Sequence, residues 1–97
     1  MSEANLALTP RKYGVQIEYC MPCDYSQHAL QAAVELMTNY QHVIDRLVFK
    51  MGSKGVFEVT VDGETIFSKK VSKRHPHSDE VLGLFRDFVG HEVPTYR

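Results

Sequence analysis

The chain has 97 residues, 43% hydrophobic and 24% charged, a composition typical of one ordinary soluble globular domain. Lys and Arg number 11 against 12 for Asp and Glu, so the formal charge of −1 excludes a large field that would attract nucleic acid. Because no segment resembles a signal peptide or reaches the length of a membrane span, we expect a cytoplasmic protein with no membrane partner.

The first half of the chain predicts a strand, a helix and a second strand. After a flexible N-terminal arm over residues 1–12, residues 15–19 alternate apolar and polar side chains, as a strand with one covered face does. Residues 25–40 repeat alanine, leucine and aromatic side chains at helical spacing. A second strand is expected over residues 46–51, and the glycines of residues 52–55 end it.

The second half predicts a hairpin and a second helix. Residues 56–61 and 65–69 read as strands, and the Asp-Gly-Glu sequence at residues 62–64 is a tight-turn signal between them. A basic loop is expected over residues 69–77. Ser78 is then expected to cap a helix with an apolar stripe, because serine is a preferred residue at that position.

This order of elements, β-α-β-β-β-α, predicts an α/β two-layer sandwich over residues 13–90, with residues 91–97 as a C-terminal tail. The helix between the first two strands implies a parallel pair with a right-handed crossover, and the hairpin makes the four-stranded sheet mixed. Polar residues at alternate positions of the strands indicate that the helices cover one face. The end of the first strand is where open α/β sheets place their active sites.

Both cysteines of the chain lie at that strand end, in the sequence Cys20-Met21-Pro22-Cys23. Two thiols with this spacing can close a disulfide, and the first turn of a helix favours a thiolate. A thiolate attacks disulfides, and a second thiol can resolve the mixed disulfide that results. Since so small a loop would join no distant elements, the pair predicts redox chemistry rather than a structural cross-link.

Two segments carry a family resemblance. Residues 15–25 (VQIEYCMPCDY) resemble the redox strand and loop of the selenoprotein W/T/H family, and residues 55–70 (GVFEVTVDGETIFSKK) resemble its glycine-led hairpin. The resemblance covers roughly residues 13–90. It implies a thioredoxin-like fold, a redox role by thiol or selenol exchange, and glutathione as a candidate reductant. Cys23 stands where selenium-containing members carry selenocysteine.

The attacking thiol stays open at this point. The geometry of thioredoxin folds favours Cys20, which we expect to be less covered by the following helix and to be the more acidic thiol. The selenocysteine alignment favours Cys23. Met21 and Pro22 are expected to contact the substrate, as is Gly55 in the loop that takes the place of the thioredoxin cis-proline.

Two alternatives compete with a catalytic redox pair. Cys20 and Cys23 could bind zinc with two of His28, His75 and His77, although no second short-spaced pair supports this and we expect no metal. The pair could also sense redox state and gate partner binding without turnover. The preferred hypothesis is a thiol–disulfide oxidoreductase with a protein or small-molecule thiol or disulfide as substrate. The uncovered sheet face or an edge strand is available for a homo-oligomer.

Overall fold

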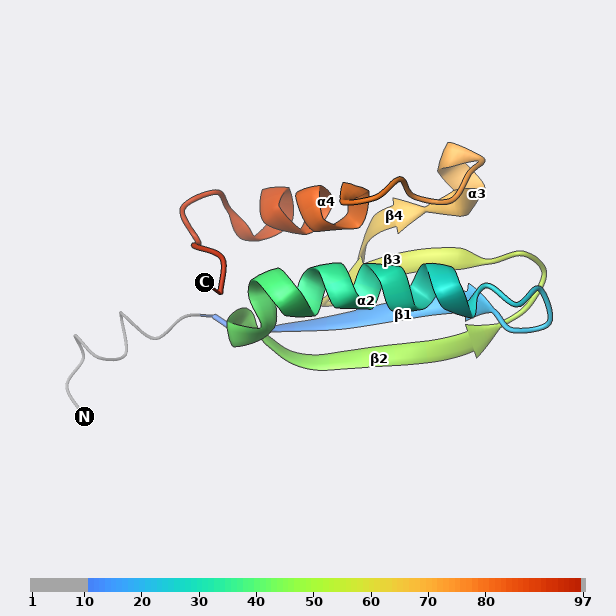
Figure 1. The fold of residues 1–97 in the computed structure, drawn as a ribbon, viewed down its shortest axis with the longest axis horizontal. Helices are drawn as coiled ribbons and strands as arrows, with labels where there is room; N and C mark the ends of the chain where they lie inside the picture. The colour runs from blue at the N-terminus through green and yellow to red at the C-terminus, as the bar shows by residue number, and fades with distance from the viewer. Residues whose placement is uncertain (1–10, 97) are drawn as a thin grey trace.

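One four-stranded sheet organises residues 11–96, the part of the chain that the computed structural model describes (Figure 1). The strands lie in the order β2-β1-β3-β4, with β1 parallel to β2 and antiparallel to β3, and β3 antiparallel to β4. The predicted mixed sheet is therefore confirmed. The elements are β1 (Tyr13–Cys20), α2 (Ser26–Tyr40), a 3₁₀ turn (Gln41–Val43), β2 (Ile44–Gly52), β3 (Phe57–Val61), β4 (Glu64–Ser68), α3 (Lys69–Ser72) and α4 (Glu80–Val89).

Helices α2 and α4 contact each other and lie over the same face of the sheet, so the molecule has two layers (Figure 1). Every second side chain of β1 and β3 is buried and those between are half-exposed, as the alternating sequence predicts, except that Cys20 at the end of β1 is buried as well. The largest fully buried side chains come from both layers, which is the expected outcome when an amphipathic helix covers one sheet face. They include Ile17, Leu36, Tyr40, Phe57 and Phe85.

The hairpin between β3 and β4 forms at the predicted turn. Asp62 and Gly63 both have positive φ, 51° and 85°, which is the backbone of the tight turns that join antiparallel strands. The Asp62 side chain also accepts a hydrogen bond from the Gly14 amide at 2.9 Å. The turn is thereby tied to the beginning of β1, which is the end of the sheet remote from the cysteines.

The start of the last helix differs from the prediction. Helix α4 begins at Glu80, and Asp79 precedes it with φ 65° and no capping side chain, so the expected Ser78 cap is wrong. The buried Glu35 carboxylate of α2 accepts a hydrogen bond from the Asp79 amide at 2.8 Å instead. A partner 44 positions away in the sequence thus replaces the local cap.

The expected basic loop over residues 69–77 contains one short helix, α3. Its cap is Ser68, whose hydroxyl accepts a hydrogen bond from the Val71 amide at 3.3 Å. Four residues from Lys69 to Ser72 are helical, and Lys73 ends the turn with φ 65°. The loop prediction is therefore wrong for these residues, and their lysines are held along one turn of helix.

Both ends of the described chain contact the domain. Arg11, in the expected N-terminal arm, lies 2.9 Å from the Asp62 carboxylate, and the first ten residues of that arm lie outside the described residues. In the expected C-terminal tail, the Tyr96 amide donates to the Asn39 carbonyl at 2.7 Å. Within residues 11–96, no helix is both long and apolar enough to cross a membrane.

Candidate redox site

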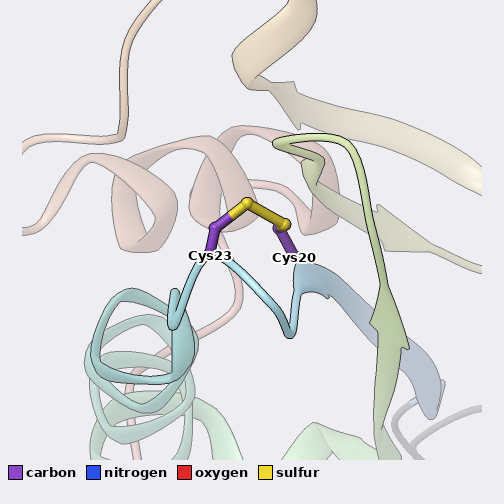
Figure 2. Close-up of a disulfide and its surroundings, with 2 residues drawn as sticks. All are labelled: Cys20 and Cys23. Atoms are coloured by element: carbon purple, nitrogen blue, oxygen red, sulfur yellow. A yellow bond between two sulfur atoms is a disulfide. The ribbon is translucent and has the colours of Figure 1, made fainter.

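A disulfide joins Cys20 and Cys23 at the carboxyl end of β1 (Figure 2). Their Cα atoms are 5.2 Å apart. Two backbone hydrogen bonds close the intervening turn: the Asp24 amide donates to the Met21 carbonyl at 2.9 Å, and the Tyr25 amide donates to the Cys20 carbonyl at 3.1 Å. The predicted adjacency of the two sulfur atoms follows from this turn.

The two cysteines differ in their access to solvent. Cys20 has an exposed fraction of 0%, whereas Cys23, Met21 and Pro22 are exposed. The expectation that Cys20 would be the less covered thiol is therefore wrong. Cys20 is the last residue of the central strand β1, and its amide is hydrogen-bonded to the Val56 carbonyl, whereas Cys23 lies in the turn that follows the strand.

Cys23 also lies outside the following helix. Helix α2 begins at Ser26 and its N-terminal flanking residue is Tyr25, so the expected placement of the pair in the first helical turn is wrong. Asp24, with φ 61°, turns the chain before the helix starts. The effect of the helix dipole on a sulfur atom falls off within the first turn, so it is weaker at Cys23 than the sequence indicated.

The loop between β2 and β3 lies beside the disulfide (Figure 2). The Cys20 amide donates to the Val56 carbonyl at 2.8 Å, and the Met21 amide donates to the Gly52 carbonyl at 3.0 Å. A Cβ atom at Gly52 would lie 2.8 Å from the side chains of Glu18 and Val56, so Gly52 is the glycine that a close approach requires. The sequence carries no local signal for this role of Gly52, because Glu18 and Val56 meet it only in the folded sheet.

Gly55, the glycine that the sequence singled out, has φ 76°, a conformation that favours glycine. The nearest atom to a Cβ placed there is the Lys69 ammonium nitrogen, at 4.0 Å. Gly55 therefore serves the turn and leaves open space beside Lys69. Its expected contact with substrate stays a prediction.

A histidine and aromatic cluster packs against the turn that holds the disulfide. The rings of His28 and His75 stack with centroids 3.6 Å apart, and the Tyr25 ring meets His75 edge-on at 4.3 Å. Phe57 lies beneath, 5.5 Å from His75. No three His, Cys, Asp or Glu side chains among residues 11–96 are placed to hold a metal ion, so the zinc alternative has no structural support there.

The environment of His75 disfavours protonation of its ring. Burial lowers the pKa of His75 from its ordinary value of 6.5, and electrostatic interactions with His28 and Lys69 lower it further. Its Nδ1 atom is buried without a hydrogen-bond partner in the described structure. The Lys69 ammonium group lies 5.6 Å from the centroid of the Tyr25 ring, so this charge is close to the redox turn.

A basic pocket opens between the β2–β3 loop and α3, with a volume of about 580 Å³. Four of its lining residues are lysines and one is a glutamate. The lining residues are Ser53, Lys54, Gly55, Val56, Glu58, Lys69, Lys70 and Lys73.

Arg74, which follows these lysines in the sequence, is engaged elsewhere. Its guanidinium group forms two hydrogen bonds to the Glu80 carboxylate, at 2.7 and 2.9 Å. This contact, with a further hydrogen bond from the His77 amide, lowers the pKa of Glu80 to about 2. The sequence had grouped Arg74 with the lysines as one basic loop, and the structure separates them.

The other side of the disulfide turn is apolar. A shallow groove of about 170 Å³ lies between α2 and the edge strand β2. It is lined by Tyr19, Ser26, Ala29, Leu30, Phe49 and Met51. The exposed fraction of Met51 is 61% and that of Leu30 is 48%, so a partner could reach these side chains. Because β2 is an edge strand, its apolar side chains Phe49 and Met51 stay partly open to solvent.

Most of the chain matches a known protein family. The model of the Rdx family matches residues 14–87. Migration and invasion enhancer 1 of Mus musculus is 25% identical over 72 residues, covering 74% of this chain and 61% of that protein. The Bos taurus protein of the same name is 28% identical over 76 residues, covering 76% and 64%. The chain thus spans less than two thirds of the length of these relatives.

Two solved structures share the fold. A protein from Bordetella parapertussis superimposes with a TM-score of 0.76 at 22% identity, over 80% of this chain and 99% of that one. A selenoprotein W-related protein from Vibrio cholerae gives a TM-score of 0.75 at 23% identity, over 82% of this chain and all of that one. The thioredoxin-like fold that the resemblance implied is confirmed.

Proposed function

The chain belongs to the Rdx family, and from that premise we propose that it is a thiol–disulfide oxidoreductase acting through Cys20 and Cys23. The observation that carries the proposal is the disulfide at the carboxyl end of a central strand, with one of its two residues exposed. A CxxC pair in this position of an α/β sheet is typical of transient rather than structural disulfides. The protein would work in a reducing compartment such as the cytoplasm.

Cys23 is the attacking residue in this proposal, since a substrate sulfur can approach it from solvent whereas Cys20 is fully covered. The Cys23 thiolate attacks one sulfur of a substrate disulfide, forming a mixed disulfide while the substrate S–S bond breaks and the departing sulfur takes a proton. The Cys20 thiolate then attacks the Cys23 sulfur, which closes the internal disulfide and releases the second substrate thiol.

Over this cycle the substrate gains two electrons and two protons, and the protein dithiol becomes a disulfide. Two equivalents of a small thiol, with glutathione as the candidate, would restore the dithiol. The electrons thus come from thiols alone, and the proposal requires no metal or organic cofactor. Met21 and Pro22 are exposed beside the sulfur atoms and would contact the substrate.

Serine variants of the two cysteines test the proposal, because the chain has only these 2 cysteines and every trapped species is therefore assignable. We expect Cys20→Ser to attack a peptide disulfide and accumulate the mixed disulfide, and Cys23→Ser to lose nearly all attack. Mass spectrometry after rapid acid quench measures both. The opposite pattern would make Cys20 the nucleophile.

Turnover separates the enzyme from a redox-sensing interaction module. The reduction potential of the pair, measured against glutathione buffers, should permit reduction by cellular thiols, and the wild type should reduce a peptide disulfide over many cycles. A wild type that exchanges once and then binds a partner only in one redox state would identify the module instead. A Cys20–Cys23 disulfide that glutathione cannot reduce would refute both the enzyme and the redox-sensing module.

A further inference from the structure

We propose that the four lysines of the basic pocket select substrates in which acidic residues of a polypeptide flank the reacting sulfur. This inference rests on the proposed function and adds a substrate class to it. The four residues are Lys54, Lys69, Lys70 and Lys73, and we refer to them as the lysine pocket.

The lysine pocket adjoins the disulfide through the backbone. Val56, which lines the pocket, accepts the hydrogen bond of the Cys20 amide at 2.8 Å. The Lys69 ammonium group lies beside the open space at Gly55 and 5.6 Å from the centroid of the Tyr25 ring. The backbone amide of Tyr25 donates a hydrogen bond to the Cys20 carbonyl. A chain whose sulfur reaches Cys23 can therefore continue over this loop into the pocket.

In the part of the chain that the structure describes, no carboxylate forms an ion pair with the ammonium groups of the lysine pocket. Among residues 11–96, none of the four lysines forms an ion pair or a side-chain hydrogen bond. The single carboxylate in the lining, Glu58, accepts a hydrogen bond from the Ser68 hydroxyl. Four ammonium groups thus face one carboxylate, in a chain whose overall formal charge is −1. The lining of the pocket is therefore positively charged although the chain as a whole is not.

The size and the lining favour a segment of polypeptide. A volume of about 580 Å³ is larger than one carboxylate needs, and the lining contains no aromatic side chain on which a ring could stack. Lys54, Lys70 and Lys73 are exposed, so the pocket is open and an extended chain can pass through it. Several carboxylates in succession, as in an acidic peptide, match four separated ammonium groups better than a single one does.

Three peptide disulfides of equal length test the proposal, with Asp, Asn or Lys on both sides of the cysteine. Each rate is divided by the rate of the same peptide with a small neutral dithiol, because flanking charge changes the reactivity of the sulfur itself. The full-length reduced protein should prefer the Asp peptide over the Asn peptide about five- to tenfold in kcat/KM at low salt. The preference should fall to about twofold near 0.5 M salt, where screening is strong.

The triple variant Lys69→Gln, Lys70→Gln, Lys73→Gln should lower this preference close to one, while circular dichroism verifies that it folds. Lys50→Gln is the matched control, since Lys50 is an exposed lysine of β2 that does not line the pocket, and it should keep the preference. A wild type without preference, or a triple variant that retains it, overturns the inference.

Failure of the proposed function gives a different result. If the wild type reduces none of the peptides, the oxidoreductase proposal fails, and the lysine pocket is then tested by binding alone. The probe is a labelled Asp peptide with serine in place of cysteine, followed by fluorescence anisotropy with the oxidised protein. Binding that the triple variant loses and Lys50→Gln keeps supports acidic-peptide docking. An absence of binding to the wild type overturns it.

Discussion

Two basic regions lie next to each other near the disulfide and differ in how their charges are used. The Arg74 guanidinium is held by the Glu80 carboxylate at 2.7 and 2.9 Å, which connects the loop after α3 to the beginning of α4. The lysine pocket has no such contact among the described residues. A cation with a carboxylate partner fixes local structure, whereas one without a partner stays available for a ligand.

Phe57 follows the pocket residue Val56 in the sequence and contacts His75, which follows Arg74, and removal of the Phe57 side chain should have the largest effect on stability. Phe57 is completely buried, and its ring lies 5.5 Å from His75 and 6.2 Å from Phe67. Phe57→Ala should lower the free energy of unfolding by about 3–5 kcal/mol, because a large cavity remains. Urea denaturation measures the loss. The control Met51→Ala, at a side chain 61% exposed, should change stability by less than about 0.5 kcal/mol.

Removing the carboxylate partner tests the comparison itself. Glu80→Gln should lower the free energy of unfolding at neutral pH by about 1 kcal/mol or less, the usual range for a solvent-accessible pair. Lys70→Gln, which removes an exposed lysine without a partner, should leave that free energy unchanged within about 0.5 kcal/mol. Equal losses of unfolding free energy in Glu80→Gln and Lys70→Gln would contradict the distinction between paired and unpaired charges.

The same pair predicts a pH dependence. The folded-state pKa of Glu80 is about 2, below its ordinary value of 4.5, so its contribution is present above that ordinary value. The contribution is lost as the pH falls from 4.5 toward 2, because Glu80 then takes up a proton more readily in the unfolded chain. Stability of wild type and Glu80→Gln should therefore converge through this window. Parallel curves would contradict the assignment.

Replacement of His75 should have the smallest effect on stability, and this effect should appear at higher pH than that of Glu80. Its folded-state pKa is lowered from 6.5, so the unfolded chain binds a proton more readily and stability falls as the pH drops below that value. His75→Gln should lose less stability than the wild type between about pH 7.5 and pH 5.5, by tenths of a kcal/mol. Thermal unfolding at several pH values measures the two slopes, and equal slopes would contradict the prediction.

The local patterns of the sequence predicted most of the fold. Alternating side chains located β1 and β3, helical spacing located α2, and the turn at Asp62 and Gly63 located the hairpin. The Ser78 cap failed for a reason that no local pattern contains, since Glu35 of another helix binds the Asp79 amide and α4 begins after it, at Glu80. Only the packing of α2 against α4 brings that carboxylate to the Asp79 amide.

What the sequence by itself determined is the candidate thiol pair: two cysteines separated by two residues at the end of a strand, in a chain of Rdx type. Tertiary structure alone decided which of the two is exposed, because Cys20 ends a central strand and is buried, whereas Cys23 lies in the exposed turn after it. It also assembled the lysine pocket, in which Lys54 of the β2–β3 loop joins Lys69 of α3. Burial and charge pairing depend on neighbours that only folding brings together, whereas the reactivity of a thiol pair begins with its covalent spacing.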